Sequence, residues 1–352
     1  MRLCYPPPGT MVARSAPFAW LILGAALTAG APQQLPQVIE RVEVARILID
    51  VRVLSPDGAP VLNLSVSDFS VTIDGKPARV DSMEWVPGSP AAIALAPPSR
   101  PSGGEAAATP GGRLIVFLFQ KEIESSRIGG LTRMLERAHD LVNKLAPTDR
   151  VAVLMFDSHL KIFADFTSDR ARLAPVLDRA ILFEDPPVLR PSPDFSLAAH
   201  LDPAAMRRAA TLEEALALVG EGLEPLPGPK SLVLFAWGIG RLERTRVVVD
   251  DDYGRARRAL ASARVAVFSL DVTDADYHSL EAGLQAVADD TGGFYERTHQ
   301  FAGLAMMRLE GALAGHYVLI VERPDAKRGT HTITVELVKR RGIVLARSSY
   351  VG

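Results

Sequence analysis

Six successive apolar residues at 114–119 form the strongest hydrophobic signal in the chain. The run follows a Gly-Gly pair and precedes a polar segment, which indicates a strand buried on both faces at the centre of a parallel sheet. Similar apolar runs follow at 151–156, 230–235 and 265–270. Ligands bind at the carboxyl ends of strands in open α/β sheets, so the first part of any site is expected between Gln120 and Ser126.

Helical patterns separate these runs, since apolar residues recur there at the spacing of an amphipathic helix. The expected helices cover 127–145, Thr167 to about Phe183, 204–223, 253–263 and 276–290. The expected minor strands are an edge strand at 160–163 and a short strand at 294–295. Strands that alternate with helices indicate βαβ units, so the pattern predicts a doubly wound, mostly parallel α/β sheet.

Both ends of this α/β region read as β-structure. Residues 42–53 are followed by a hairpin around Asp74-Gly75, a pair that favours the positive φ of a tight turn. After His316, further strands are expected at 317–321, 330–338 and 343–349. Few short strands are stable alone, so the two ends are expected to complete one small β module.

The pattern divides residues 37–352 into a β module, an α/β domain and a linker. The β module takes residues 37–87 and 316–352, and the α/β domain takes residues 113–300. Residues 88–112 are rich in Pro, Ala, Gly and Ser and have little capacity to form a core, so they are expected to be a linker.

The N-terminus has the pattern of an export signal over residues 1–31. Arg2 and Arg14 precede the apolar run 16–27, and small residues follow it. The run is shorter than the roughly 20 residues of a membrane span, so an exported, periplasmic or secreted chain without membrane insertion after cleavage is expected. An uncleaved anchor is the alternative, and either Met1 or Met11 can be the start.

The composition excludes some classes of chemistry for this chain. The single cysteine, Cys4, precedes the apolar run, so a cleaved chain has no disulfide, thiolate metal site or cysteine nucleophile. With 39 basic and 41 acidic residues, the net charge of -2 gives no case for nucleic-acid binding.

The ordered segments resemble a von Willebrand factor type A domain, specifically that of exported bacterial VWFA-related proteins. The resemblance covers nearly the whole chain after residue 31, and it rests on the ordered set of segments, which are 113–119, 145–156, 166–170, 230–235, 265–270 and 290–293, with flanks at 68–76, 315–319 and 346–350. It implies a type A, Rossmann-like fold that binds a protein partner at the top of the sheet.

Such domains usually carry a magnesium site made from Asp-x-Ser-x-Ser after the first strand, a later Thr and a later Asp. Here the first motif reads Gln120, Glu122 and Glu124, the Thr is matched by Thr211, and the Asp position holds Trp237. Because tryptophan offers no oxygen ligand, the resemblance implies a degenerate site with no cofactor. If any cation binds, the expected ligands are Glu122, Glu124, Ser126 and Thr211.

Two interpretations of this edge stay open. The segment is either a solvated loop whose acidic residues favour the positive end of the next helix, or a partner-binding surface. The candidate partner-binding residues are Gln120, Glu122, Glu124, Ser125, Ser126, Thr211, Trp237 and Gly238.

Other motifs are weaker. Gly238-Ile239-Gly240 lacks the third glycine of a dinucleotide loop, and Asp250–Asp252 is a short acidic run. His139-Asp140 and Ser158-His159 occur without the Gly-x-Ser-x-Gly elbow of a hydrolase. The expectation is therefore a non-enzymatic protein-interaction module, with a structural block of an envelope assembly as the alternative and a hydrolase as a distant one.

Overall fold

The computed structural model describes residues 46–88, 112–189, 195–244, 246–249, 251–323 and 328–352. The expected export signal and residues 89–111 of the expected linker lie outside these ranges. Among the described residues, no helix is both long and apolar enough to cross a membrane.

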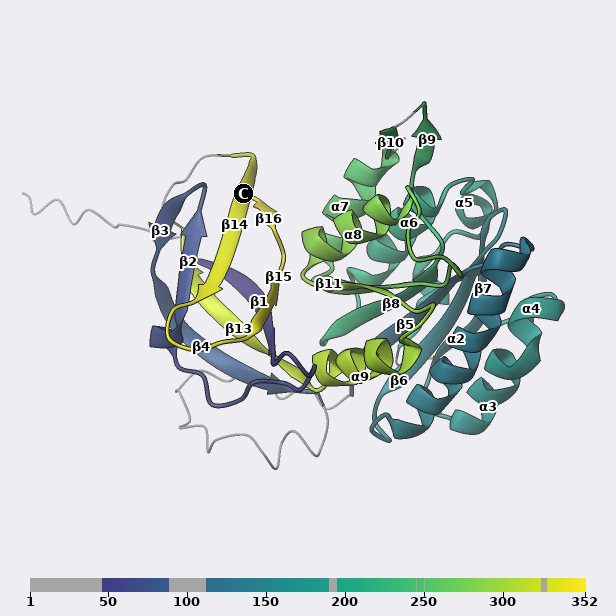
Figure 1. Ribbon diagram of the computed structural model, residues 1–352, viewed down its shortest axis with the longest axis horizontal. Coiled ribbons are helices and arrows are strands. Elements are labelled where there is room, and N and C mark those ends of the chain that lie inside the picture. Colours follow the sequence, from purple (N-terminus) through teal and green to yellow (C-terminus); the bar gives the residue numbers. More distant parts are fainter. Residues whose placement is uncertain (1–45, 89–111, 190–194, 245, 250, 324–327) are drawn as a thin grey trace, which may run out of the picture. The chain divides into compact units, whose positions relative to one another are not determined.

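A six-stranded sheet forms the centre of the α/β domain, in the order β12-β11-β8-β5-β6-β7 (Figure 1). Its strands are β5 (Leu114–Gln120), β6 (Arg150–Phe156), β7 (Leu160–Thr167), β8 (Lys230–Ala236), β11 (Val265–Asp271) and β12 (Tyr295–Arg297). All neighbours run parallel except β7, which pairs antiparallel with β6. The chain starts in the middle at β5, moves out to β7, and returns to β8 on the other side of β5. The carboxyl ends of β5 and β8 therefore form the switch point of the sheet.

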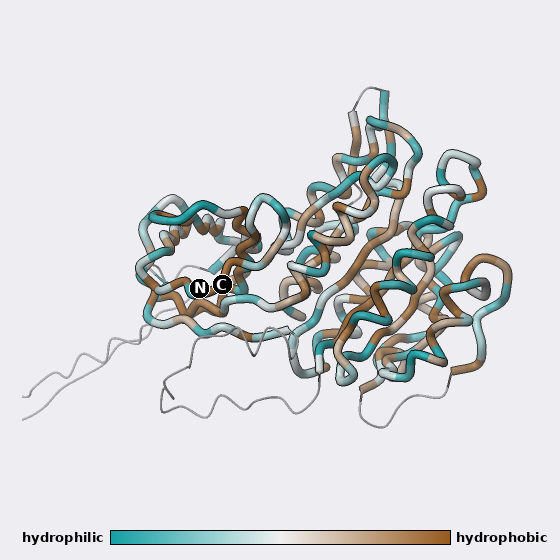
Figure 2. Tube along the Cα trace, turned by 60° about the horizontal axis from the view of Figure 1, so that its bottom comes forward, coloured by the Kyte–Doolittle hydropathy of each residue, from teal (hydrophilic) through white to brown (hydrophobic). Residues whose placement is uncertain are grey.

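Helices cover both faces of this sheet. Within β5, Ile115, Phe117 and Phe119 belong to the core on one face, and the residues between them belong to the core on the other. The first face packs against α2 (Ser125–Lys144), α3 (Arg170–Pro175), α4 (Ile181–Phe183) and α9 (Ala302–Leu313). The second face packs against α5 (Pro203–Arg208), α6 (Leu212–Leu223), α7 (Asp252–Ser262) and α8 (Glu281–Thr291). Figure 2 shows the apolar strands enclosed between helices with polar outer faces.

The two chain ends together form the β module. It contains two four-stranded antiparallel sheets, β15-β1-β13-β4 and β16-β14-β2-β3, and each sheet takes strands from both ends of the chain. The strands are β1 (Arg46–Leu54), β2 (Phe69–Ile73), β3 (Lys76–Ala78), β4 (Val80–Pro87), β13 (Gly315–Glu322), β14 (Thr330–Leu337), β15 (Ile343–Ala346) and β16 (Ser349–Val351). The predicted fold class, a doubly wound sheet with a β module from both ends, is confirmed.

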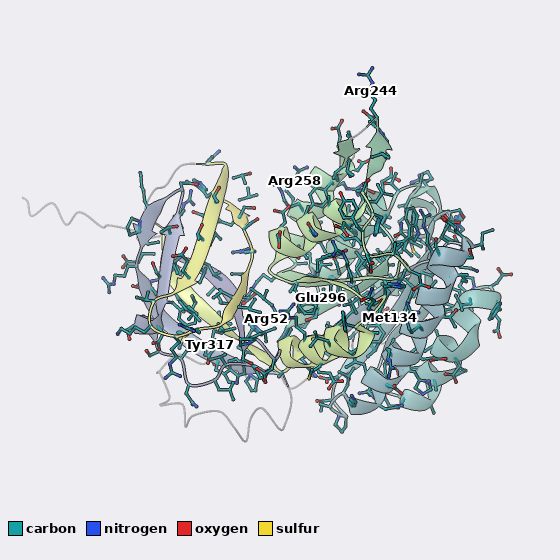
Figure 3. The ribbon with its side chains drawn as sticks, viewed as in Figure 1. Arg52, Met134, Arg244, Arg258, Glu296 and Tyr317 are labelled. Atoms are coloured by element: carbon teal, nitrogen blue, oxygen red, sulfur yellow. The ribbon has the colours of Figure 1, made fainter. Side chains whose placement is uncertain are left out.

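The core of the β module is apolar and holds two buried tyrosines, Tyr350 and Tyr317, of which Tyr317 is labelled in Figure 3. The hydroxyl of Tyr317 donates to the carbonyl of Val61 at 3.0 Å and accepts from the amide of Leu64 at 3.3 Å. These bonds attach the loop between β1 and β2 to β13. Asp74 and Gly75 have φ values of 50° and 74°, as expected for the turn between β2 and β3.

Three helices differ from the sequence expectation. The segment 204–223 is two helices, because the Thr211 hydroxyl accepts from the amide of Glu214 at 3.2 Å and starts α6. The helix expected from Thr167 begins after Asp169, and a π-helical turn at Val176–Ala180 follows Pro175. The helix expected from residue 276 begins at Glu281.

Two further elements were not expected. Helix α9 leads directly into β13, and it packs Ala305, Leu309 and Ala312 into the core at helical spacing. A small hairpin of β9 (Arg241–Glu243) and β10 (Arg246–Val248) follows β8. Arg244 projects at its tip (Figure 3).

Candidate functional site

Gln120 joins the two strand ends at the switch point. Its side chain is 5% exposed, and its amide oxygen accepts hydrogen bonds from the backbone N–H groups of Trp237 at 3.0 Å and Gly238 at 3.2 Å. These amides follow the last residue of β8. Where the type A motif would place an aspartate, a neutral amide thus satisfies two backbone donors across the sheet.

Arg127, in the first turn of α2, lies between Trp237 and two glutamates of the loop after β5. Its guanidinium carbon lies 3.9 Å from the ring centroid of Trp237. Its nitrogens lie 3.3 Å from an oxygen of Glu124 and 3.7 Å from an oxygen of Glu122. The three contacted side chains stand at three of the five motif positions. The guanidinium of Arg127 therefore places a positive charge beside both glutamates and over the ring of Trp237.

Sequence reasoning did not single out Arg127. A signal was present, because a basic residue three positions after Glu124 can turn back toward it at the start of a helix. What the sequence lacked was the position of Trp237, which is 110 residues away and reaches Arg127 only because β5 and β8 are neighbours.

The remaining oxygens of the loop have local partners. An oxygen of Glu122 accepts from the amide of Ile123 at 3.0 Å, and the hydroxyl of Ser126 donates to an oxygen of Glu124 at 3.0 Å. Glu124 is the N-cap residue of α2, but its side chain does not cap the helix. Ser125 is the first residue of α2 and is exposed.

Thr211 stands apart from this set in its contacts. Its hydroxyl caps α6, and the side chain of Glu214 returns to the amides of Ala210 at 2.6 Å and Thr211 at 3.4 Å. Among the described hydrogen bonds and ion pairs, none joins Thr211 to the loop after β5. The structure thus brings together Gln120, Glu122, Glu124 and Trp237 but leaves Thr211 as a helix cap.

Trp237 and Gly238 are held in place by packing. Trp237 is half-buried, and its indole nitrogen is buried without a hydrogen-bond partner among the described residues. A Cβ atom on Gly238 would lie 2.5 Å from the Cβ of Leu280. Gly238 therefore allows the close approach of the segment before α8.

A second loop contacts the start of α2. The amide of Asp274 donates to the carbonyl of Ser126 at 2.8 Å, and its carboxylate pairs with Arg133 and lies 3.3 Å from Nδ1 of His299. Gln300 donates to Asp276 at 2.7 Å. The loops after β5, β11 and β12 are thereby connected.

Large apolar side chains are exposed on these three loops. Ile123 is 83% exposed, Tyr277 71% and Phe301 66%. We call residues 122–127, 237–238, 274–277 and 299–301 the carboxyl-edge surface. Exposed apolar residues that gather on one surface are typical of contact sites for other macromolecules.

The other candidate motifs do not assemble a catalytic arrangement among the described residues. Ser158 lies 3.0 Å from Nδ1 of His159, but the nearest carboxylate, on Asp157, faces the same ring nitrogen at 3.9 Å. An acid that orients a catalytic histidine must bind the opposite nitrogen. The Nδ1 atom of His139 pairs with Asp178 at 2.6 Å on a different surface.

No family model matches the chain, and no curated protein matches it. Among solved structures, the chain is similar to the human COPII-coat protein Sec24c, with 12% identity and a TM-score of 0.42 over 68% of this chain and 44% of that one. It therefore spans less than half of Sec24c.

Two bacterial structures are also similar. BatB from Bacteroides thetaiotaomicron has 15% identity and a TM-score of 0.37, over 57% of this chain and 98% of that one. The PilB minor pilin of Streptococcus sanguinis has 9% identity and a TM-score of 0.35, over 75% and 86%. The six-stranded, mostly parallel central sheet of this chain has the α/β architecture that the sequence predicted.

Proposed function

We propose that this chain is an exported, non-enzymatic module that binds a protein partner through its carboxyl-edge surface without a divalent cation. The observation that carries the proposal is the position of Arg127 between Glu122, Glu124 and Trp237. Magnesium prefers an octahedron of oxygen ligands. Here the motif offers an amide that already binds two backbone donors, an indole, and two carboxylates that face a guanidinium.

A protein partner is favoured by the exposed apolar residues. Ile123 lies between Glu122 and Glu124, and its side chain is among the most exposed of the large apolar side chains described. The loop that carries it is held by Arg127 and by the bond from Asp274, so Ile123 is presented on an ordered support. A pre-ordered apolar anchor inside a polar rim is typical of a protein-binding hot spot.

The test is partner capture by the full chain from an envelope fraction of the host, with cross-linking, in excess EDTA and in excess magnesium. Ile123→Asp is expected to weaken capture of the same partner at least about tenfold, as for loss of a hot spot. The matched control is Val338→Asp, which changes an exposed valine of the β module that is 62% exposed.

Capture that is equal in EDTA and magnesium, lost in Ile123→Asp and kept in Val338→Asp supports the proposal. Capture that needs magnesium, or that survives Ile123→Asp, contradicts it. Loss only in the β-module variant favours the alternative of a structural building block.

A further inference from the structure

Three metal-ligating side chains meet at the carboxyl end of β11, outside the degenerate motif. Asp271 is the last residue of β11, His278 lies in the loop that follows, and Glu281 is the first residue of α8. One ligand atom from each of the three lies within 4.8 Å of the others. Oδ2 of Asp271 and Nε2 of His278 are 2.7 Å apart.

Both carboxylates are buried and oriented. Asp271 is 1% exposed and Glu281 4% exposed. Oδ1 of Asp271 accepts from the amide of Thr273 at 2.9 Å, which turns Oδ2 toward the histidine. Such outer contacts fix the direction of a ligand before a metal arrives.

The loop that follows Asp271 carries a buried hydroxyl, that of Thr273, which lacks a partner among the described residues. Oγ1 of Thr273 has no hydrogen-bond partner among the described residues, although Thr273 is only 9% exposed. It lies two residues beyond Asp271, and its own amide binds that carboxylate. A buried oxygen without a partner is costly in a fold that has no use for it.

A tyrosine hydroxyl and an arginine guanidinium contact the two carboxylates in this structure. The hydroxyl of Tyr295 lies 2.8 Å from Oδ2 of Asp271 and 3.1 Å from Oε2 of Glu281. Arg297 donates to both oxygens of Glu281, at 2.9 Å and 2.7 Å. The Arg297 side chain is 45% exposed, so it can leave Glu281 for solvent without opening the core.

We propose that Asp271, His278 and Glu281 bind a divalent transition-metal ion such as Zn²⁺, in competition with the side chain of Arg297. The ligand set determines the class of metal. One imidazole nitrogen with two carboxylate oxygens suits zinc and its neighbours, whereas magnesium and calcium prefer oxygen alone. Metal bonds of about 2.0–2.2 Å place tetrahedral ligands about 3.3 Å apart. This spacing lies between the 2.7 Å contact of Asp271 with His278 and the 4.8 Å within which all three ligand atoms lie.

The three proposed zinc ligands are not among the residues of the carboxyl-edge surface, although His278 directly follows its segment 274–277. Zinc binding here makes no use of Glu122 or Glu124, and partner capture through Ile123 makes no use of zinc. Either proposal can therefore fail while the other stands.

The experiment is calorimetric titration of the full chain with ZnCl₂, in a Cys4→Ser background that removes the only thiol. One saturable site is expected. His278→Ala is expected to weaken zinc binding at least about tenfold, since one of three ligands is lost. Arg297→Met should strengthen binding several-fold, because the competing cation is removed while side-chain length is kept.

The matched control is His139→Ala, which removes a histidine that lies 2.6 Å from a single carboxylate, Asp178. It should leave the zinc affinity unchanged. A second probe, Co²⁺, should give visible absorption bands that disappear in His278→Ala. Equal zinc affinity in the parent and His278→Ala, or weaker binding in Arg297→Met, overturns the proposal.

Discussion

At the scale of single residues, the switch point is held by groups of the chain itself. The Gln120 amide replaces one expected ligand and binds two backbone donors of the neighbouring strand end. Arg127 places a positive charge against the ring of Trp237 and near two glutamates. Each of these exposed ion pairs contributes little by itself, and the stacking on tryptophan adds about 0.5–1 kcal/mol. These contacts of Arg127 fix the positions of the side chains at the switch point more than they add to the free energy of unfolding.

Replacement of Gln120 tests the first contact. Gln120→Leu leaves two backbone N–H groups near Trp237 without their acceptor, so the free energy of unfolding should fall by about 1–3 kcal/mol. Urea unfolding measures the change. The control is Gln300→Leu, since Gln300 is exposed and bonds only at the surface, to Asp276. A near-zero change in Gln120→Leu would show that water replaces the lost acceptor.

At the scale of elements, helix α2 lies close to the end of the sheet because one of its residues, Gly130, has no side chain. A Cβ atom on Gly130 would lie 1.8 Å from the carbonyl oxygen of Val272, just after β11. Gly130 therefore sets how closely α2 approaches the loop that carries Asp274. Gly303 in α9 has no atom within 4 Å of the same ideal position.

These two glycines make a matched pair. Gly130→Ala should lower the free energy of unfolding by at least about 1–3 kcal/mol, because backbone must shift to admit the methyl group. Gly303→Ala should raise it by about 0.5–1 kcal/mol, because alanine restricts the unfolded chain and fits the helix. Thermal and urea unfolding measure both. Equal effects of the two substitutions would contradict the close approach of α2.

At the scale of the whole molecule, the β module and the α/β domain share contacts. The Nε atom of Arg52 on β1 donates to the carbonyl of Ala312 at 3.2 Å, at the end of α9. Arg264, which precedes β11, pairs with Asp50 on β1. His316 on β13 lies 3.6 Å from Asp50 and is buried.

Stability should depend on pH through His316. Burial, together with the positive charges of Arg52 and Arg264, lowers the pKa of His316 to about 4, although Asp50 opposes the shift. The unfolded chain has a histidine pKa of about 6.5, so between about pH 4 and 6.5 it binds a proton at this residue and the folded chain does not. The contribution of neutral His316 to the free energy of unfolding is thus complete above about pH 6.5. It decreases as pH falls toward 4, by at most about 3 kcal/mol.

The measurement is the free energy of unfolding between pH 4 and 7 for the parent and His316→Gln. The variant should lose this part of the pH dependence, while the carboxylates other than Asp50, which faces His316, affect both proteins alike. His200→Gln is the control because His200 is exposed. If the slopes of the parent and His316→Gln coincide, His316 is not buried in its neutral form.

The sequence by itself determined the regular part of this protein. Continuous apolar runs such as 114–119 have one stable placement, a strand covered on both faces, so the central strands and the α/β class were predictable. The β module was also predictable, because strands at the two chain ends lack partners unless they pair with each other. Helix ends were less predictable, because a capping residue such as Thr211 can start a new helix within a segment whose apolar pattern continues.

Only the tertiary structure decided the sites. Arg127 meets Trp237 because β5 and β8 are adjacent, and Asp271 meets Tyr295 because β11 pairs with β12. Hydrophobic periodicity determines which face of an element is buried, but it carries no information on which strand ends become neighbours. Side chains far apart in the sequence therefore meet at distances that only the order and register of the strands determine.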